Sequence, residues 1–200
     1  MNIIVFECEN ISIDMRGANP NQKELRPASF KGVMRFWWRA IHGNLPLIKL
    51  KKQEDDIFGS TDKKSSFSIK IKKYQGIPKN FEIEFIKSPR CDFDIQSFFE
   101  LVVLLGGFGK SAKNINQGKI KILTIQVNKQ SKITYNEPNN LNDILNLLNS
   151  INQSFELKNN EIIGRNFKFN YPMVYRIWID NGVLNTKFKD NKIFQRKING

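Results

Sequence analysis

The stretch from Glu24 to Gly43 constrains the fold of this chain most, because it predicts a helix with two different faces. Pro27 disfavours helical geometry at the residue before it, and Ser29 can cap a helix that starts at Phe30. Gly43 is a residue type that commonly ends helices. One face repeats apolar side chains at helical spacing, and we expect these to pack in the core: Phe30, Val33, Met34, Trp37 and Ile41.

The opposite face of the predicted helix carries cations around an indole: Lys31, Arg35, Trp38, Arg39 and His42. No acidic residue of the same helix stands at a spacing that would offset them. An exposed tryptophan is well suited to stack on a base, whereas a solvated charged face is the ordinary alternative. The pattern favours nucleic-acid contact, and we predict that these five residues bind a nucleic acid.

Two motifs in this region resemble a known family. The run ELRPASFKGVMRFWWRAIHG and the later IFGSTDKKSSFSI, from Ile57 to Ile69, are similar to subunit one of the type III-B CRISPR effector, the Cmr module. That subunit belongs to the RAMP superfamily of RNA-binding ferredoxin-like proteins. The resemblance implies an antiviral ribonucleoprotein subunit that contacts guide or target RNA near the 3′ part of the guide, with other Cmr subunits as partners. It also implies that the loop with Arg16 lies near RNA.

Composition agrees with a polyanionic partner. The chain has 200 residues and a net charge of +13, which favours RNA, DNA or an anionic membrane surface. No apolar run is long enough for a membrane span and the N-terminus does not read as a secretory signal, so we expect a cytoplasmic protein without a membrane partner. Cys8 and Cys91 with a single histidine do not make a zinc site, so we expect buried free thiols, no metal and no cofactor.

The remaining pattern predicts an α+β fold of the ferredoxin-like type. Strand patterns over 1–13, 66–74, 81–87 and 120–127 alternate with the first helix and an amphipathic helix over 93–105, capped near Asp92 or Asp94. This order predicts a four-stranded antiparallel sheet with two helices on one face, and 47–58 predicts a further short helix.

We assign residues 1–128 to this RAMP domain and 129–200 to a C-terminal extension or reduced second module. Within the second part, 141–151 has a helical apolar stripe and 171–179 has a strand pattern. An elaboration of the first domain, or partial disorder, are the alternatives.

A glycine-rich loop follows the second predicted helix. Gly107 and Gly109 would let the backbone approach a phosphate, and Lys110 and Lys113 would add charge, so we predict RNA contact here as well. A P-loop is excluded because Leu104 stands where a glycine is required, and a dinucleotide fingerprint is excluded because a helix precedes it. A tight turn after a helix is the purely structural alternative.

The sequence predicts a non-catalytic protein. Several CRISPR repeat-cleaving endoribonucleases that share the RAMP fold use a histidine as general acid or base, and His42 is the single candidate here, with no obvious second catalytic group beside it. Asp55 and Asp56 diverge on a helix and do not form a metal pair. A metal-independent endoribonuclease that uses His42, and a structural subunit whose basic face docks on an acidic protein, remain the alternatives.

Overall fold

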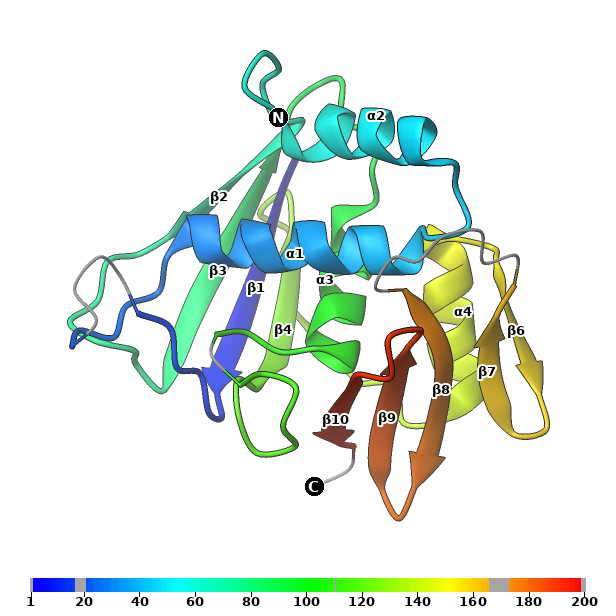
Figure 1. Cartoon of the computed structure of the whole chain (residues 1–200). Helices are drawn as coiled ribbons and strands as arrows, with labels where there is room; N and C mark the ends of the chain where they lie inside the picture. The colour runs from blue at the N-terminus through cyan, green and yellow to red at the C-terminus, as the bar shows by residue number, and fades with distance from the viewer. Residues whose placement is uncertain (1, 17–20, 110, 166–172, 199–200) are drawn as a thin grey trace.

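The computed structural model describes residues 2–16, 21–109, 111–165 and 173–198. Its first sheet contains β1 (Asn2–Asn10), β2 (Phe67–Ile71), β3 (Asn80–Lys87) and β4 (Ile120–Val127) in the antiparallel order β2-β3-β1-β4. The two-residue strand β5 (Ile133–Thr134) adds to the edge of β4. Helices α1 (Pro27–Ile41) and α3 (Ile95–Leu105) cover one face of this sheet (Figure 1). The predicted ferredoxin-like arrangement is therefore confirmed.

Alternating side chains of the first sheet form the centre of the core. On β1, Phe6 and Cys8 point inward, and the Phe6 ring lies 4.7 Å from that of Phe99 on α3. Phe85 of β3 packs on the same Phe99 ring at 5.0 Å between centroids. Both cysteines are buried free thiols, as predicted, and burial strongly raises the pKa of Cys8. The predicted core face of α1 is also confirmed, with Val33 at its partly buried margin.

The ends of α1 differ from the prediction. The helix begins at Pro27 and its N-cap is Arg26, without a side-chain cap, so Ser29 lies inside the first turn. Proline suits the first helical position because that position needs no N–H donor. The helix ends at Ile41 with His42 as its C-cap. Gly43 follows, and a Cβ there would overlap the Met173 side chain, which would have to move to accommodate a larger residue.

Helix α3 has a wide buried face, and its predicted amphipathic character is present as a narrow polar side. Asp94 caps it by accepting a hydrogen bond from the Ser97 N–H at 3.1 Å. Eight of its eleven residues are buried, and the other three, Gln96, Ser97 and Glu100, share one side of the helix. A helix with so wide an apolar face needs cover on more than one side. The first sheet covers one side of α3, and the C-terminal part of the chain covers the other.

The C-terminal part forms a helix and a second sheet. Helix α4 (Leu141–Ile151) is followed by five antiparallel strands in chain order, namely β6 (Phe155–Lys158), β7 (Glu161–Gly164), β8 (Val174–Asp180), β9 (Val183–Phe188) and β10 (Ile193–Lys197). The predicted helix over 141–151 is confirmed. Of the predicted strand over 171–179, Tyr171 and Pro172 lie outside the described residues, and β8 begins at Val174.

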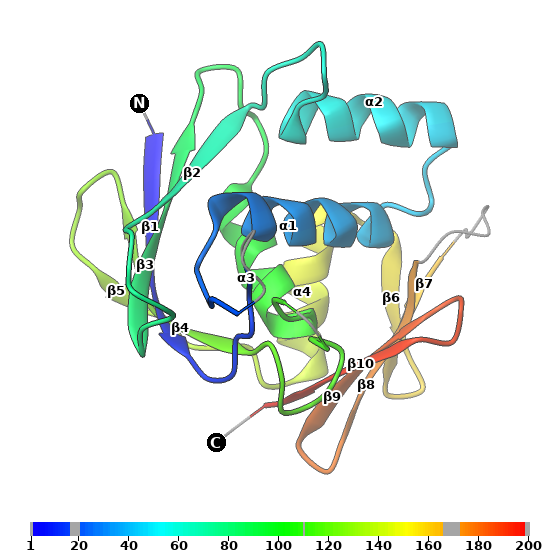
Figure 2. The same ribbon diagram turned by 60° about the vertical axis from the view of Figure 1, so that its left-hand side comes forward.

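Helices α3 and α4 lie between the two sheets (Figure 2). Rings of Phe188 and Phe194 lie 5.4 and 5.1 Å from the ring of Trp37 on α1, so both sheets share one core. Strand β5, beyond residue 128, still pairs with β4. The division at 128 remains a prediction. None of the described helices combines the length and the apolar character needed to cross a membrane.

Candidate nucleic-acid interface

The basic face of α1 is turned towards helix α2 (Leu47–Phe58), which lies beside α1 (Figure 1). Glu54 of α2 forms a bidentate ion pair with Arg39, and Arg35 Nε lies 3.2 Å from the same carboxylate. Arg35 also donates to the carbonyl of Gly59. The acidic partner missing from α1 is therefore supplied by α2. Glu54 is 7% exposed, whereas Arg35 and Arg39 keep about a third of their side-chain surface exposed (33% and 37%).

Trp38 does not face outward, and this part of the sequence prediction is wrong. The residue is 1% exposed, and its ring stacks on that of His42 at 4.3 Å. His42 Nδ1 donates to the Trp38 carbonyl at 2.8 Å, and burial lowers the pKa of His42 to about 4. The imidazole is therefore neutral at pH 7. Helix α2, through Phe58, packs against the indole that was expected to stack on a base.

An open depression between α1, α2 and the loop after α2 collects the cations of this region. It has a volume of about 730 Å³, and we call it the basic groove, defined by Lys31, Arg35, Lys51, Lys63 and Lys64. Asp55 and Asp62 also line it. Sequence reasoning identified Lys31 and Arg35 but missed the other three, because it treated α2 and its loop separately from α1.

Three lysines of the basic groove are available for a ligand. Lys63 pairs with Asp56, and Arg35 pairs with Glu54. Lys31, Lys51 and Lys64 form no ion pair with any described residue. Burial and the nearby Arg35 lower the pKa of Lys31. Because like charges repel here, an anion placed in the groove would be stabilised.

The loop after α2 is shaped by a glycine. Gly59 adopts a φ of +84°, and a Cβ there would lie 2.8 Å from both the Lys63 carbonyl and the Ser65 nitrogen. The Ser60 N–H donates to the Lys63 carbonyl at 2.8 Å and closes the turn. The turn holds Lys63 and Lys64 at the groove. The two motifs of the sequence, over Glu24–Gly43 and Ile57–Ile69, thus meet at one site.

The glycine-rich loop after α3 is built by close backbone packing. A Cβ at Gly107 would crowd the Ala112 and Gly118 carbonyls, and Gly109, at a φ of +92°, bridges to Asp14. The loop lies on the opposite side of α1 from α2 (Figures 1 and 2). Lys113 is exposed there, away from the basic groove, and Lys110 lies outside the described residues.

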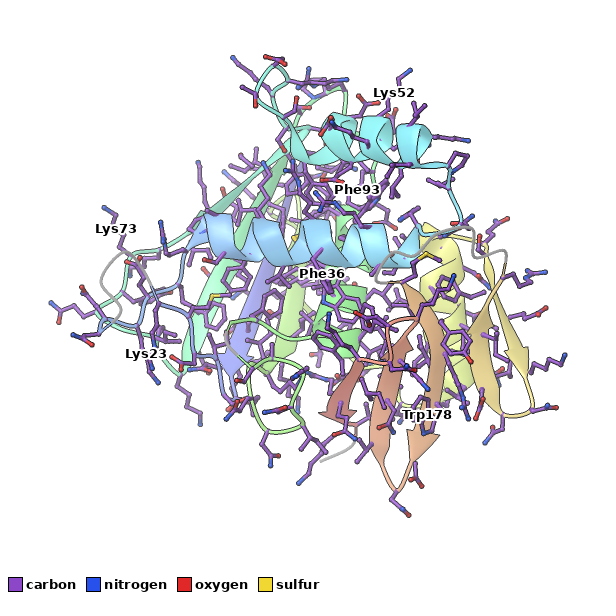
Figure 3. All side chains as sticks on the ribbon, in the orientation of Figure 1. Lys23, Phe36, Lys52, Lys73, Phe93 and Trp178 are labelled. Atoms are coloured by element: carbon purple, nitrogen blue, oxygen red, sulfur yellow. The ribbon has the colours of Figure 1, made fainter. Side chains whose placement is uncertain are left out.

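Arg16 is also separate from the basic groove. It is exposed, forms a salt bridge with Asp14 at 3.3 Å, and bridges through its backbone to Lys23. Figure 3 shows Lys23 far from Lys52 of α2. The structure therefore brings Lys31, Arg35, Arg39, Trp38 and His42 together, but does not join Arg16 or the glycine-rich loop to them.

A buried lysine anchors the glycine-rich loop, and no pattern in the sequence marks it. Lys119 is 5% exposed and donates to the carbonyls of Gly106 (3.0 Å) and Ala112 (2.7 Å). Burial lowers the pKa of Lys119 to about 7, and repulsion by Arg196 adds to the effect. Lys119 therefore has a structural role.

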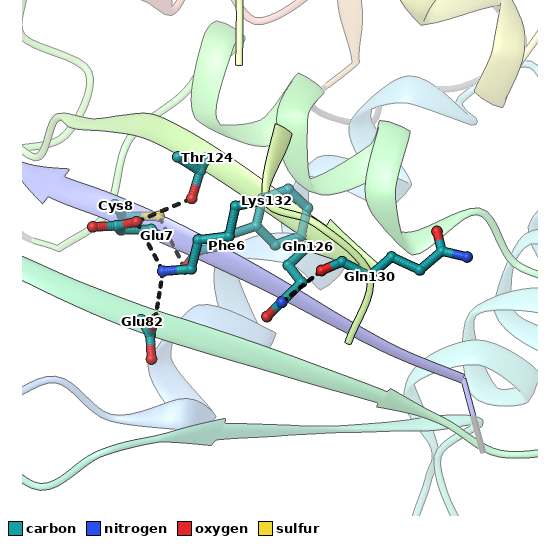
Figure 4. A network of polar contacts seen from close by, with 8 residues as sticks. All are labelled: Phe6, Glu7, Cys8, Glu82, Thr124, Gln126, Gln130 and Lys132. Atoms are coloured by element: carbon teal, nitrogen blue, oxygen red, sulfur yellow. Dashed lines mark hydrogen bonds and ion pairs between the residues drawn. The ribbon is translucent and has the colours of Figure 1, made fainter. Parts of the chain in front are cut away.

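The outer face of the first sheet is poorly suited to a polyanion. Glu7 accepts hydrogen bonds from Thr124 (3.0 Å) and from Lys132 (3.2 Å), and Lys132 also reaches Glu82 at 3.3 Å (Figure 4). Two carboxylates thus share one lysine at the centre of the face.

Among the described residues, no three His, Cys, Asp or Glu side chains are grouped closely enough to hold a metal ion.

Comparison with known proteins identifies the class. Residues 15–197 match the RAMP superfamily model, and the chain belongs to the RAMP superfamily. Two relatives from Pyrococcus furiosus then specify the resemblance. CRISPR system Cmr subunit Cmr1-2 is 41% identical over 70 residues, covering 33% of this chain and 37% of the relative. Subunit Cmr1-1 is 36% identical over 76 residues, covering 36% and 22%. The chain therefore matches well under half of either relative.

Solved structures show the same fold. The apo crystal structure of Cmr1 from Pyrococcus furiosus aligns with a TM-score of 0.53 and 20% identity, over 74% of this chain and 59% of that one. A chain in the cryo-EM structure of the type III-B Cmr-beta complex bound to cognate target RNA aligns with a TM-score of 0.56 and 11% identity, over 76% and 63%. The resemblance to subunit one of the Cmr module is confirmed.

We predict that Glu54→Gln destabilises the fold by about 1–3 kcal/mol, because two partly buried guanidinium groups lose their charged acceptor. Asp55→Asn removes the same charge one position away, outside this ion pair, and should change the free energy of unfolding by less than about 0.5 kcal/mol. Urea unfolding monitored by circular dichroism measures both. Equal effects of the two substitutions would contradict the assigned role of Glu54.

We also predict that stability rises with pH above neutrality because of Lys119. The pKa of this lysine is about 7 in the folded chain and near 10.5 when unfolded, so between these values the unfolded chain binds more protons. One such proton contributes as much as about 1.4 kcal/mol per pH unit. Unfolding measured between pH 7.5 and 9.5 should show this slope, and Lys119→Met should flatten it. The exposed Lys121→Met is the control and should leave the slope unchanged.

Proposed function

We propose that this chain is a non-catalytic RNA-binding subunit of a type III-B CRISPR (Cmr) ribonucleoprotein, and that its basic groove holds RNA phosphates. In this role it would help capture target RNA near the 3′ part of the guide, together with other Cmr subunits in the cytoplasm. The basic groove carries this proposal, because both family-like motifs converge on it. The relatives named as Cmr subunits, and the similar chain in a complex bound to target RNA, support the assignment.

The groove fits a phosphate backbone better than it fits a base. Its lining is mostly polar, and its unpaired cations come from three separate segments, namely Lys31 on α1, Lys51 on α2 and Lys64 in the loop. Flexible lysines spaced around an open depression neutralise phosphates without reading sequence. We therefore expect weak sequence preference and strong salt dependence from this site.

Arg35 and Arg39 have a positioning role in this proposal. Their bonds to Glu54 and to the Gly59 carbonyl hold α1, α2 and the loop in place, and part of each guanidinium stays exposed to a ligand. Charge reversal at either residue would disturb the groove as well as remove a cation. Trp38 packs on Phe58, which lines the groove, and His42 stacks on Trp38. Gly107, Gly109, Lys110, Lys113 and Arg16 remain predicted RNA contacts at other places on the surface.

The endoribonuclease alternative is disfavoured by the setting of His42. Its ring is stacked on Trp38, one ring nitrogen is bonded to a backbone carbonyl, and its pKa is lowered to about 4 by burial. A histidine general acid donates the second proton of an imidazolium, and this ring lacks that proton at pH 7. His42 lines a cavity of about 540 Å³ together with Asp56 and Asp92. No described side chain forms a hydrogen bond to the imidazole.

We predict that Lys31→Gln, Lys51→Gln and Lys64→Gln together weaken the binding of single-stranded RNA roughly a hundredfold at 0.1 M salt. Three phosphate contacts on a single strand contribute about 0.7 each to the log–log salt slope, so the slope should fall by about 2. Fluorescence anisotropy with a labelled oligoribonucleotide at several salt concentrations measures both quantities.

Lys70→Gln, Lys72→Gln and Lys73→Gln form the matched control, because they remove the same charge near β2. The control variant should retain most of the affinity and most of the slope. An equal loss in both variants would show that general charge, and not the basic groove, carries binding. Retained RNA affinity in the groove variant with loss of assembly into the effector would instead favour docking on an acidic protein.

We further predict that the purified protein leaves RNA intact. Labelled single-stranded RNA incubated with excess protein at pH 7 in EDTA should run unchanged on a denaturing gel, with no difference between the wild type and His42→Ala. Cleavage that disappears in His42→Ala, with the variant folded by circular dichroism, would establish the endoribonuclease alternative.

A further inference from the structure

The outer face of the second sheet, turned away from α3 and α4, has an ordered polar surface (Figure 2). Strand pairing places Trp178, Asn185 and Gln195 in one row across β8, β9 and β10. A parallel row on one side contains Arg176, Lys187 and Ile193, and a row on the other contains Asp180, Val183 and Lys197. Because side chains alternate along a strand, these rows share one face. We call this surface the Trp178 platform.

Trp178 is the one partly exposed indole of the chain. Trp37 and Trp38 are each 1% exposed, whereas Trp178 is intermediate and lies on β8 (Figure 3). Arg176 lies over its ring, with the guanidinium carbon 4.9 Å from the centroid. Arg176 is itself held in a bidentate pair by Glu161 of β7. The indole is therefore oriented before any ligand binds, which reduces the entropy lost on binding.

The neighbouring amides are also held in place. Gln195 Nε2 donates to Asn185 Oδ1 at 3.0 Å, and Asn185 Nδ2 donates to the Val183 carbonyl at 3.0 Å. Asn185, in the middle of this row, is buried, while Gln195 is exposed. Lys187 and Lys197 flank the row, and neither forms an ion pair with a described residue. An aromatic ring, an exposed amide and two cations thus lie within three adjacent strands.

We propose that the Trp178 platform is a second binding surface for single-stranded RNA, in which a base stacks on Trp178 while Lys187 and Lys197 contact phosphates. Sheet-borne aromatic rings flanked by cations bind unpaired bases, and every base offers a π-face for stacking. The apolar members, Val183 and Ile193, stand apart in different rows, so the face lacks the continuous apolar centre typical of a protein interface. The platform proposal rests on the proposed function, because RNA as the ligand is taken from it.

Intrinsic fluorescence tests the platform directly, because the two other indoles are buried. Titration of the full chain with a twelve-nucleotide oligouridylate should quench the tryptophan emission to saturation. In Trp178→Phe the remaining emission, from Trp37 and Trp38, should be unaffected by the same oligonucleotide. Quenching that persists in Trp178→Phe, or the absence of quenching in a wild type that binds the oligonucleotide, would overturn the proposal.

Affinity gives a second readout that separates this surface from the basic groove. Trp178→Ala should weaken oligouridylate binding roughly 5- to 100-fold, the range for loss of one stacked base. Leu157→Ala, an exposed apolar residue of β6, is the control and should bind as the wild type does. Lys187→Glu with Lys197→Glu keeps the indole and should also weaken binding, which covers the case that Trp178→Ala unfolds.

The two proposals fail in different ways. Unchanged affinity in both platform variants, with weaker binding in the groove variant, would overturn the platform and leave the proposed function standing. Weaker binding in the platform variants alone would keep the platform and remove the groove. Absence of any RNA binding by the wild-type chain would overturn both.

Discussion

The carboxylate of Glu54 fixes the arrangement of the helices that form the basic groove. It is almost fully buried and is shared by Arg35 and Arg39, which stay partly in water. Burying the Glu54 carboxylate is costly, and its bidentate contact with Arg39 together with the Arg35 guanidinium offsets that cost. The arrangement leaves one positive charge in excess at the junction of α1 and α2. Helices α1 and α2, which are joined by a short loop, thereby acquire a defined spacing. Arg35 also donates to the Gly59 carbonyl and so holds the loop after α2.

The sequence predicts the first sheet and the inner face of α1 well, because both follow clear periods of two and 3.6 residues. It does not predict what covers the outer face of α1, because periodicity shows that a helix has two faces but not what each one meets. The sequence of α2, the next helix, contained the signal for what covers this face. Leu50, Glu54 and Phe58 recur at four-residue spacing on α2, and all three are buried. Read alone, α2 appears as a charged surface helix, so the burial of Trp38 escaped prediction.

Part of the second sheet could also have been predicted from the sequence. Asn159-Asn160 and Asn181-Gly182 form the two-residue loops between β6 and β7 and between β8 and β9, with positive φ at all four residues. Such pairs are strong hairpin signals. Helix α3 gave a second signal, since an apolar face as wide as that of α3 requires more cover than one sheet provides. What could not be predicted is that Phe188 and Phe194, distant in sequence, would contact Trp37 and complete the core.

The net charge of +13 gives long-range attraction to RNA, but it does not locate the contact. A lysine already paired with a carboxylate must give up that partner, or share it, before it gains a phosphate. On the outer face of the first sheet, Lys132 is shared by Glu7 and Glu82, so its charge is already neutralised. Lys31, which lies over the Phe67 ring, and Lys64 of the basic groove have no carboxylate partner among the described residues, so a phosphate bound there need not displace one. The fold decides which cations are paired with carboxylates. The unpaired cations therefore mark the binding surface in a chain whose net charge is +13.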